Sequence, residues 1–455
     1  MLRTWRISFS VFLLLALVGS LFLVGCDESS PGAVEKAAED RADPGDTGAF
    51  VLDERAPSES DLRGFYFTES SKRGGRGGIV HRQFSVRVGP GPYDVVRIHR
   101  VVRERRSFRP VRTRGAVFMV HGSSQDFDDI FFTAGADDPT PQTSIPLFLA
   151  SKNIDVWGID LGWTRVPIET TDFSFMKNWG LERDIQHTLT ALSIARFLRG
   201  VTGQGFGKIH LLGFSYGAAV AYGAAALETQ QPWFLRDIKG LLPVDYGFKV
   251  DDEERRQTAC EGAALDRAAI RDGIFNVDNR EILLIGDRAA TMPDASSEVS
   301  GLTNKQLAIL LATNPPAFWQ FAGVEFDAGG IPIDLLYADP DRWIALLGTL
   351  APYMPLQATA QNAEVRCDEV DVPIDDHLSD IRLPIFHLGA GGGFGAEEGA
   401  YTASLTASDD VTIFEVSLQP EANRAFDFGH ADLFLGENAR SLAWEEVRRW
   451  LIDQP

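Results

Sequence analysis

Short, continuous apolar runs recur along the chain, with helical or loop segments between them. The six runs span residues 116–120, 154–159, 209–212, 238–244, 383–388 and 411–416. Strands that are buried on both faces of a parallel sheet have this appearance, because both rows of side chains must be apolar. Strands alternating with helices predict an α/β fold with a doubly wound, mostly parallel sheet.

Two further alternating segments, residues 84–88 and 94–101, flank a Gly-Pro-Gly-Pro turn and predict an antiparallel β-hairpin that opens the sheet. Apolar residues at helical spacing predict a helix over residues 181–200 and a closing helix over residues 437–453.

No strand-like apolar run occurs between residues 249 and 380, and this stretch is too long for an ordinary connection between two strands. It contains helix-like patches and predicts a helical cap (249–380) inserted between two parts of the core, residues 63–248 and 381–455. Cys260 and Cys367 both lie in the insertion. They either pair as a disulfide or remain as two buried thiols.

The amino-terminal residues read as an export signal. Arg3 and Arg6 precede an apolar run over residues 7–24, as in a secretory signal peptide, although the run is also just long enough to span a bilayer. Its end, Leu23-Val24-Gly25-Cys26, resembles the lipobox of bacterial lipoproteins. That resemblance implies removal of residues 1–25, lipidation of Cys26 and a protein anchored to a membrane at the periplasmic face of the cell envelope. Residues 26–62 are acidic, poor in large apolar side chains and predict a flexible tether.

The charge balance restricts the partners. The chain has 64 acidic residues against 43 lysines and arginines, a formal net charge of −21, which argues against nucleic acid as a partner. Three cysteines are too few for a cysteine-based zinc site, and the glycine run at 389–395 lacks nucleotide-binding spacing. We therefore expect no metal, no cofactor and no obligate protein partner.

The motif G-x-S-x-G occurs as Gly213-Phe214-Ser215-Tyr216-Gly217. An apolar strand runs directly into it and an alanine-rich helical run follows. A serine exposed on so tight a strand-to-helix turn needs small neighbours, which Gly213 and Gly217 supply. The context predicts Ser215 as a nucleophile at the amino terminus of a helix.

A nucleophilic serine needs a general base, and the chain has eight histidines. His210 and His387 fall within apolar strands and predict core positions. Four others lie outside the expected site: His81, His99, His187 and His377. His430 alone lies in a loop between the last strand and the closing helix, so it is the predicted base.

The segment His121-Gly122-Ser123-Ser124 follows the first strand of the parallel sheet. Gly122 lets the chain approach a substrate closely, and we expect the amides of Ser123 and Tyr216 to form an oxyanion hole.

Together these motifs resemble the α/β-hydrolase fold, in particular the lipase and carboxylesterase branch with acid-lipase-like enzymes. The resemblance covers residues 80–455. It rests on four segments: His121-Gly122, Asp155-Val156-Trp157-Gly158, the Ser215 motif and Gly429-His430-Ala431-Asp432-Leu433-Phe434. The resemblance implies a Ser/His/acid triad, no cofactor and hydrolysis of carboxylic esters, with lipid or acyl esters as substrates.

The acid departs from the family pattern, because glycines occupy the loop after the penultimate strand where an aspartate is usual. Asp245, at the end of the preceding strand, is the first candidate, since a strand end holds a carboxylate rigidly. Glu397 and Glu398 are the alternatives. A serine peptidase or acyltransferase with the same triad, or a non-catalytic binding lipoprotein, also remains open.

Overall fold

The structure is a computed structural model that describes residues 67–73, 78–313 and 319–454. The predicted signal peptide, Cys26 and the tether lie outside the described residues. From Phe67 onward the chain forms one compact unit. Within the described ranges, no helix is both long and apolar enough to cross a membrane.

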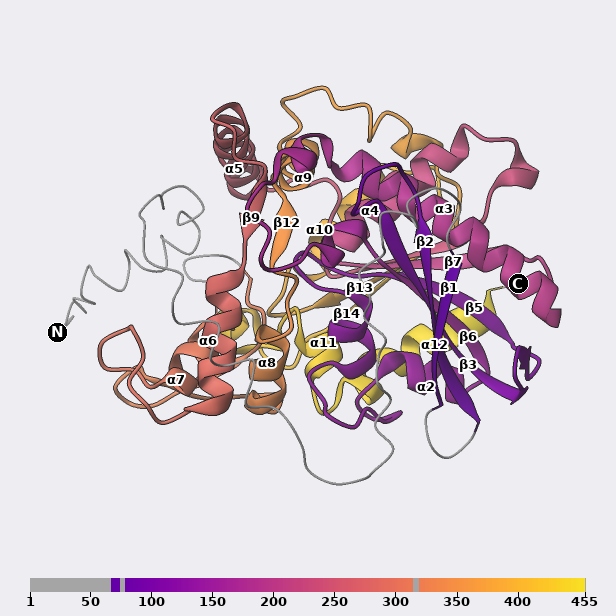
Figure 1. The fold of residues 1–455 in the computed structure, drawn as a ribbon. Coiled ribbons are helices and arrows are strands. Elements are labelled where there is room, and N and C mark those ends of the chain that lie inside the picture. The colour runs from indigo at the N-terminus through magenta and orange to yellow at the C-terminus, as the bar shows by residue number, and fades with distance from the viewer. Residues whose placement is uncertain (1–66, 74–77, 314–318, 455) are drawn as a thin grey trace. The chain divides into compact units, whose positions relative to one another are not determined.

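A ten-stranded sheet forms the centre of this unit (Figure 1). Its strands are β1 (Phe67–Arg73), β2 (Ile79–Arg87), β3 (Val95–Arg106), β4 (Arg109–Pro110), β5 (Gly115–Val120), β6 (Ile154–Asp160), β7 (Ile209–Phe214), β8 (Ile238–Val244), β13 (Ile385–Ala390) and β14 (Val411–Val416). They lie in the order β1-β2-β3-β6-β5-β7-β8-β13-β14, with β4 paired to β3. The first three are antiparallel to their neighbours, and the remaining six of the main path are parallel. The predicted doubly wound sheet with an antiparallel hairpin is confirmed.

The sheet reverses its direction of winding at β5. The chain leaves β5, crosses through α2 (Ile145–Ser151) to β6, and returns through α3 (Leu181–Arg199) to β7 on the other side of β5. Loops diverge at such a switch point, and open α/β sheets bind ligands there, beyond the carboxyl ends of the strands.

The two faces of the sheet are buried by different helices. Along β5, Phe118 and Val120 pack in the cluster that contains α3 and α4 (Tyr216–Thr229). Val117 and Met119 point the other way, into the cluster that contains α2 and α12 (Glu445–Asp453). Each of the four side chains is fully buried, which explains why the strand reads as an unbroken apolar run.

The segment between β8 and β13 contains more than helices. Its elements are α5 (Glu253–Arg271), β9 (Asn276–Asp278), α6 (Arg280–Thr291), α7 (Asn304–Leu310), β10 (Val324–Phe326), β11 (Pro332–Leu335), α8 (Pro340–Leu347), β12 (Tyr353–Pro355) and α9 (Leu356–Cys367). The short strands pair as β9 with β12 and β10 with β11, and Figure 1 shows α6, α7 and α8 beside one another. A disulfide between Cys260 and Cys367 joins α5 to α9.

The closing helix begins later than predicted. After α11 (Asp432–Leu435), regular helical structure resumes only at Arg440, in a turn that leads into α12. Gly436 instead pairs with Ala338, and the amide of Glu437 donates to the carbonyl of Tyr337. The insertion therefore binds the backbone groups with which the predicted helix would have started.

Candidate active site

Ser215 occupies a strained turn between β7 and α4. Its backbone has φ 54° and ψ −125°, in a region that side-chain-bearing residues rarely adopt. A Cβ on Gly213 would lie 2.0 Å from the carbonyl oxygen of Gly217, and one on Gly217 would lie 2.2 Å from that of Val120. Both glycines are required for the close packing that presents Ser215.

The loop after β5 lies against this turn. A Cβ on Gly122 would lie 3.1 Å from Cβ of Ser215. Within the described part of the chain, the amides of Ser123 and Tyr216 donate no hydrogen bond to protein. Both amides are consequently available to a ligand oxygen, and that of Tyr216 lies at the positive end of the α4 dipole.

His121 supports this loop and is not a base. Its Nδ1 lies 2.9 Å from the carbonyl oxygen of Gly122, and its Nε2 accepts from the amide of Leu161 at 3.2 Å. These partners require the neutral tautomer with its proton on Nδ1. Burial lowers the pKa of His121 to about 4, which keeps the ring neutral.

His430 lies in the loop immediately before α11, and its ring is fixed from several sides. Nδ1 lies 2.7 Å from Oδ2 of Asp245, and the backbone amide donates to the carbonyl of Gln320 at 3.0 Å. The ring stacks on Phe214, the neighbour of Ser215, with centroids 4.4 Å apart. Nδ1 is thus engaged with a carboxylate, which leaves Nε2 as the nitrogen for proton transfer.

Asp245 follows β8 and is held by an array of donors. Its carboxylate accepts backbone amides from Ala390 at 2.8 Å, Gly395 at 2.9 Å and Phe394 at 3.1 Å, besides the contact with His430. Complete burial opposes ionisation, yet the bond and charge of His430 and these amides hold the pKa of Asp245 below its usual value. The carboxylate is therefore ionised, as an acid that orients a histidine must be.

The glycine-rich loop after β13 explains the departure from the family pattern. A Cβ on Gly393 would lie 2.0 Å from Oδ2 of Asp245. The loop lacks an acid of its own, and its missing side chains make room for the carboxylate that arrives from the neighbouring strand, β8.

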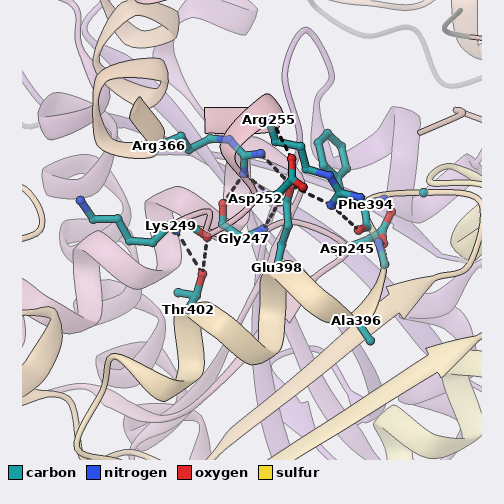
Figure 2. A network of polar contacts seen from close by, with 12 residues as sticks. Asp245, Gly247, Lys249, Asp252, Arg255, Arg366, Phe394, Ala396, Glu398 and Thr402 are labelled. Atoms are coloured by element: carbon teal, nitrogen blue, oxygen red, sulfur yellow. Dashed lines mark hydrogen bonds and ion pairs between the residues drawn. The ribbon is translucent and has the colours of Figure 1, made fainter. Parts of the chain in front are cut away.

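The alternative acids lie elsewhere. Glu398, on α10 (Gly395–Ser404), is buried and accepts from Arg366 at 2.9 and 3.0 Å and from Arg255 at 3.3 Å. Figure 2 shows these two arginines converging on its carboxylate. Glu397 is exposed. Glu398 ties α10 to the insertion helices α9 and α5, and neither glutamate contacts His430.

Asp432 positions the histidine loop. Its Oδ2 accepts the amides of Gly429 at 2.8 Å and of Gly323 at 3.0 Å. Burial, only partly offset by these two bonds, raises the pKa of Asp432 to about 7. The sequence does contain a signal for this role: an aspartate three residues after Gly429 can accept its amide, and such local side-chain-to-backbone hydrogen bonds stabilise turns.

Aromatic side chains surround the histidine. Trp319 lies with its ring centroid 5.6 Å from that of His430 and stacks on Phe394 at 4.6 Å, and Phe321 lies 6.4 Å from His430. Trp319 and Phe321 are only partly buried. Three other tryptophans, Trp163, Trp179 and Trp343, are buried in the core.

Comparisons with known proteins locate the fold. Neither a protein-family model nor a curated protein matches the chain. A candidate lipase from Sulfolobus solfataricus superposes with a TM-score of 0.59 at 19% identity, over 86% of this chain and 99% of that one. A monoglyceride lipase from Saccharomyces cerevisiae reaches 0.42 at 9% identity (78% and 91% covered), and an esterase from Thermogutta terrifontis 0.39 at 14% (81% and 97%). The first similarity agrees with the strand order of the sheet, and the described part of the chain has the α/β-hydrolase fold.

Proposed function

We propose that the protein is a serine hydrolase of carboxylic esters, with Ser215 as nucleophile, His430 as general base and Asp245 as the acid that orients it. The proposal rests mainly on the 2.7 Å contact between Nδ1 of His430 and Oδ2 of Asp245. The ring of His430 also stacks on Phe214, the residue before Ser215. Few structural roles require a buried carboxylate, an imidazole and a strained serine in this order.

In the proposed mechanism, Oγ of Ser215 attacks the ester carbonyl carbon while Nε2 of His430 takes its proton. The amides of Ser123 and Tyr216 donate to the oxyanion. His430 then returns the proton to the leaving alcohol, and an acyl-enzyme on Ser215 remains. Water, deprotonated by His430, attacks that ester and releases the carboxylic acid, and Asp245 stabilises the imidazolium in both halves.

The aromatic surroundings of His430 favour an apolar substrate. Trp319 and Phe321 are partly exposed beside the ring, and such side chains bury acyl chains favourably. We infer a substrate with an acyl chain, of the lipid-ester class.

A lipid anchor on Cys26 is the second part of the proposal. It rests on the basic residues, the apolar run and the Leu23-Val24-Gly25-Cys26 sequence. Palmitate incorporation that is lost in Cys26→Ala would support an envelope lipoprotein, and equal incorporation in the variant would contradict it.

A fluorophosphonate probe and a series of p-nitrophenyl esters from short to long acyl chains test the activity. We expect labelling and turnover by the wild type and by Ser404→Ala, an exposed control serine, and neither by Ser215→Ala. Equal labelling of Ser215→Ala would refute the assignment. A folded wild type that is never labelled would favour a binding protein, and turnover of amides or acyl transfer to alcohols would favour a peptidase or an acyltransferase.

A further inference from the structure

A second group of ligating side chains lies outside the Ser215 site. His81 on β2, His99 on β3 and Asp128, at the start of the helical turn η1 (Asp128–Thr133), face one another. Nε2 of His81 lies 2.9 Å from Nδ1 of His99, and Oδ1 of Asp128 lies 3.7 and 3.8 Å from these two nitrogens.

These separations fit a metal ion. The point in the plane of these three atoms that is equidistant from them lies about 2.0 Å from each, and an ion displaced from the plane by about 0.6 Å towards a fourth ligand would lie about 2.1 Å from each. Both values match zinc–nitrogen and zinc–oxygen bond lengths. Two imidazole nitrogens and a carboxylate oxygen are ligands that zinc accepts.

The neighbours of these side chains orient them as the outer shell of a metal site does. Nε2 of His99 lies 2.9 Å from Oδ1 of Asp160 but is not aligned for a hydrogen bond. The negative charge of the carboxylate still favours a proton on Nε2, which leaves the lone pair of Nδ1 toward the cluster. Gln83 donates to the second oxygen of Asp128 at 2.9 Å. Asp160 also accepts the amide of Phe127 at 3.0 Å, which fixes its own position.

A hydrogen bond between the two imidazoles would account for their 2.9 Å contact but not for Asp128. Its Oδ1 is buried and has no hydrogen-bond partner among the described residues, and both imidazole nitrogens lie beyond hydrogen-bond reach of it. A buried carboxylate oxygen without a partner is costly, and a cation at the equidistant point would satisfy it.

We propose that His81, His99 and Asp128 bind a divalent transition-metal ion, with zinc as the fitting ion and water as a fourth ligand. The side chains of His81 and His99 are 3% and 0% exposed, whereas that of Asp128 is 28% exposed, although its Oδ1 is buried. This departs from the sequence expectation of no metal, because the three residues lie on separate elements that only the fold brings together.

The site would join the antiparallel hairpin to the segment after β5. Asp128 follows Gly122 and Ser123 on that segment, whereas His81 and His99 lie on the hairpin strands. A bound ion would therefore cross-link the segment after β5, which contains Ser123, to strands β2 and β3 of the sheet. It would position the expected oxyanion donor and take no part in ester hydrolysis itself.

Zinc binding by the full chain tests the proposal. Protein stripped with a chelator is titrated with zinc against a chromophoric competitor, and cobalt(II) is substituted to record its visible spectrum. We expect one zinc per chain, a higher melting temperature with zinc, and a tetrahedral cobalt spectrum. His81→Gln and Asp128→Asn should each weaken zinc binding at least about tenfold. His210→Gln, a buried histidine outside the cluster, should bind as the wild type does.

Folded wild type that binds less than one zinc at micromolar free zinc would overturn the proposal, as would equal affinity in Asp128→Asn and the wild type. Should His81→Gln not fold by circular dichroism, Asp128→Asn decides, because its side chain is partly exposed. None of these measurements depends on ester hydrolysis, so failure of the proposed activity leaves this test intact.

Discussion

The carboxylate of Asp245 lies 2.7 Å from Nδ1 of His430, although the two residues are 185 positions apart in the chain. The acid comes from the end of β8 and occupies space left by Gly393, in the loop after β13. Adjacent parallel strands end at the same edge of a sheet, so an acid on either strand end can reach one histidine. The position of an acid can therefore change between strands while its contact with the histidine is kept.

Asp245→Asn should lower kcat by about 10³- to 10⁴-fold, because an amide stabilises neither the required tautomer nor the imidazolium. Glu397→Gln, at an exposed position, should retain wild-type kcat. The test is to measure kcat for ester hydrolysis by the wild type and both variants, with melting temperatures to verify that the variants fold. A large loss in Glu397→Gln together with an active Asp245→Asn would assign the acid to the glycine-rich loop.

Gly393→Ala should reduce activity, although it replaces none of the three proposed catalytic residues. Its methyl group would lie 2.0 Å from Oδ2 of Asp245, so either the carboxylate or the loop must move away from His430. Gly262→Ala is the matched control: no atom lies within 4 Å of its new methyl group, and it lies inside α5. There alanine should stabilise the helix by up to about 1 kcal/mol. Equal kcat in the two variants would show that the room left by Gly393 is not needed.

Removing the disulfide should destabilise the protein. Cys260 and Cys367 are 107 positions apart, and closing a loop of this length contributes about 4–5 kcal/mol in the chain-entropy model. Urea unfolding of the wild type with and without reductant, and of Cys260→Ala/Cys367→Ala, measures the difference. Reductant should leave the double variant unchanged. Two free thiols on these cysteines in denatured, unreduced protein would contradict the pairing.

The free energy of unfolding should depend on pH through Asp432. Burial raises the pKa of Asp432 to about 7 in the folded protein, from an ordinary value of 3.8, so its contribution to stability is fully present below pH 3.8 and is lost as the pH rises towards 7. One pKa unit corresponds to about 1.4 kcal/mol. Asp432→Asn cannot ionise, so its stability relative to the wild type should rise between about pH 4 and 7.

Urea unfolding of the wild type and Asp432→Asn at several pH values checks this expectation. Asp409→Asn, the same substitution at an exposed position, serves as the control. A constant difference between Asp432→Asn and the wild type across the whole range would mean that burial does not hold the carboxyl group protonated.

The local pattern of the chain determined much of the fold. The apolar runs identified all six parallel strands. Five of them are buried along their length and must be apolar on both faces, whereas β14 lies at the edge of the sheet and is largely exposed. Gly213 and Gly217 indicated the sharp turn at Ser215, because only glycine fits where Gly213 meets Gly217 and where Gly217 meets Val120. The place of His430 after the last strand made it the predicted base. Each of these inferences depends on neighbours in sequence.

The tertiary structure decided what depends on distant neighbours. Whether His430 contacts Asp245 or Glu398 could not be read from the sequence, because both carboxylates lie near strand ends at the same sheet edge. The fold assigns Glu398 to Arg366 and leaves Asp245 facing the histidine. The cluster of His81, His99 and Asp128 could not be predicted from the sequence either. Side chains that meet only when three separate elements pack together leave no spacing in the chain that identifies them.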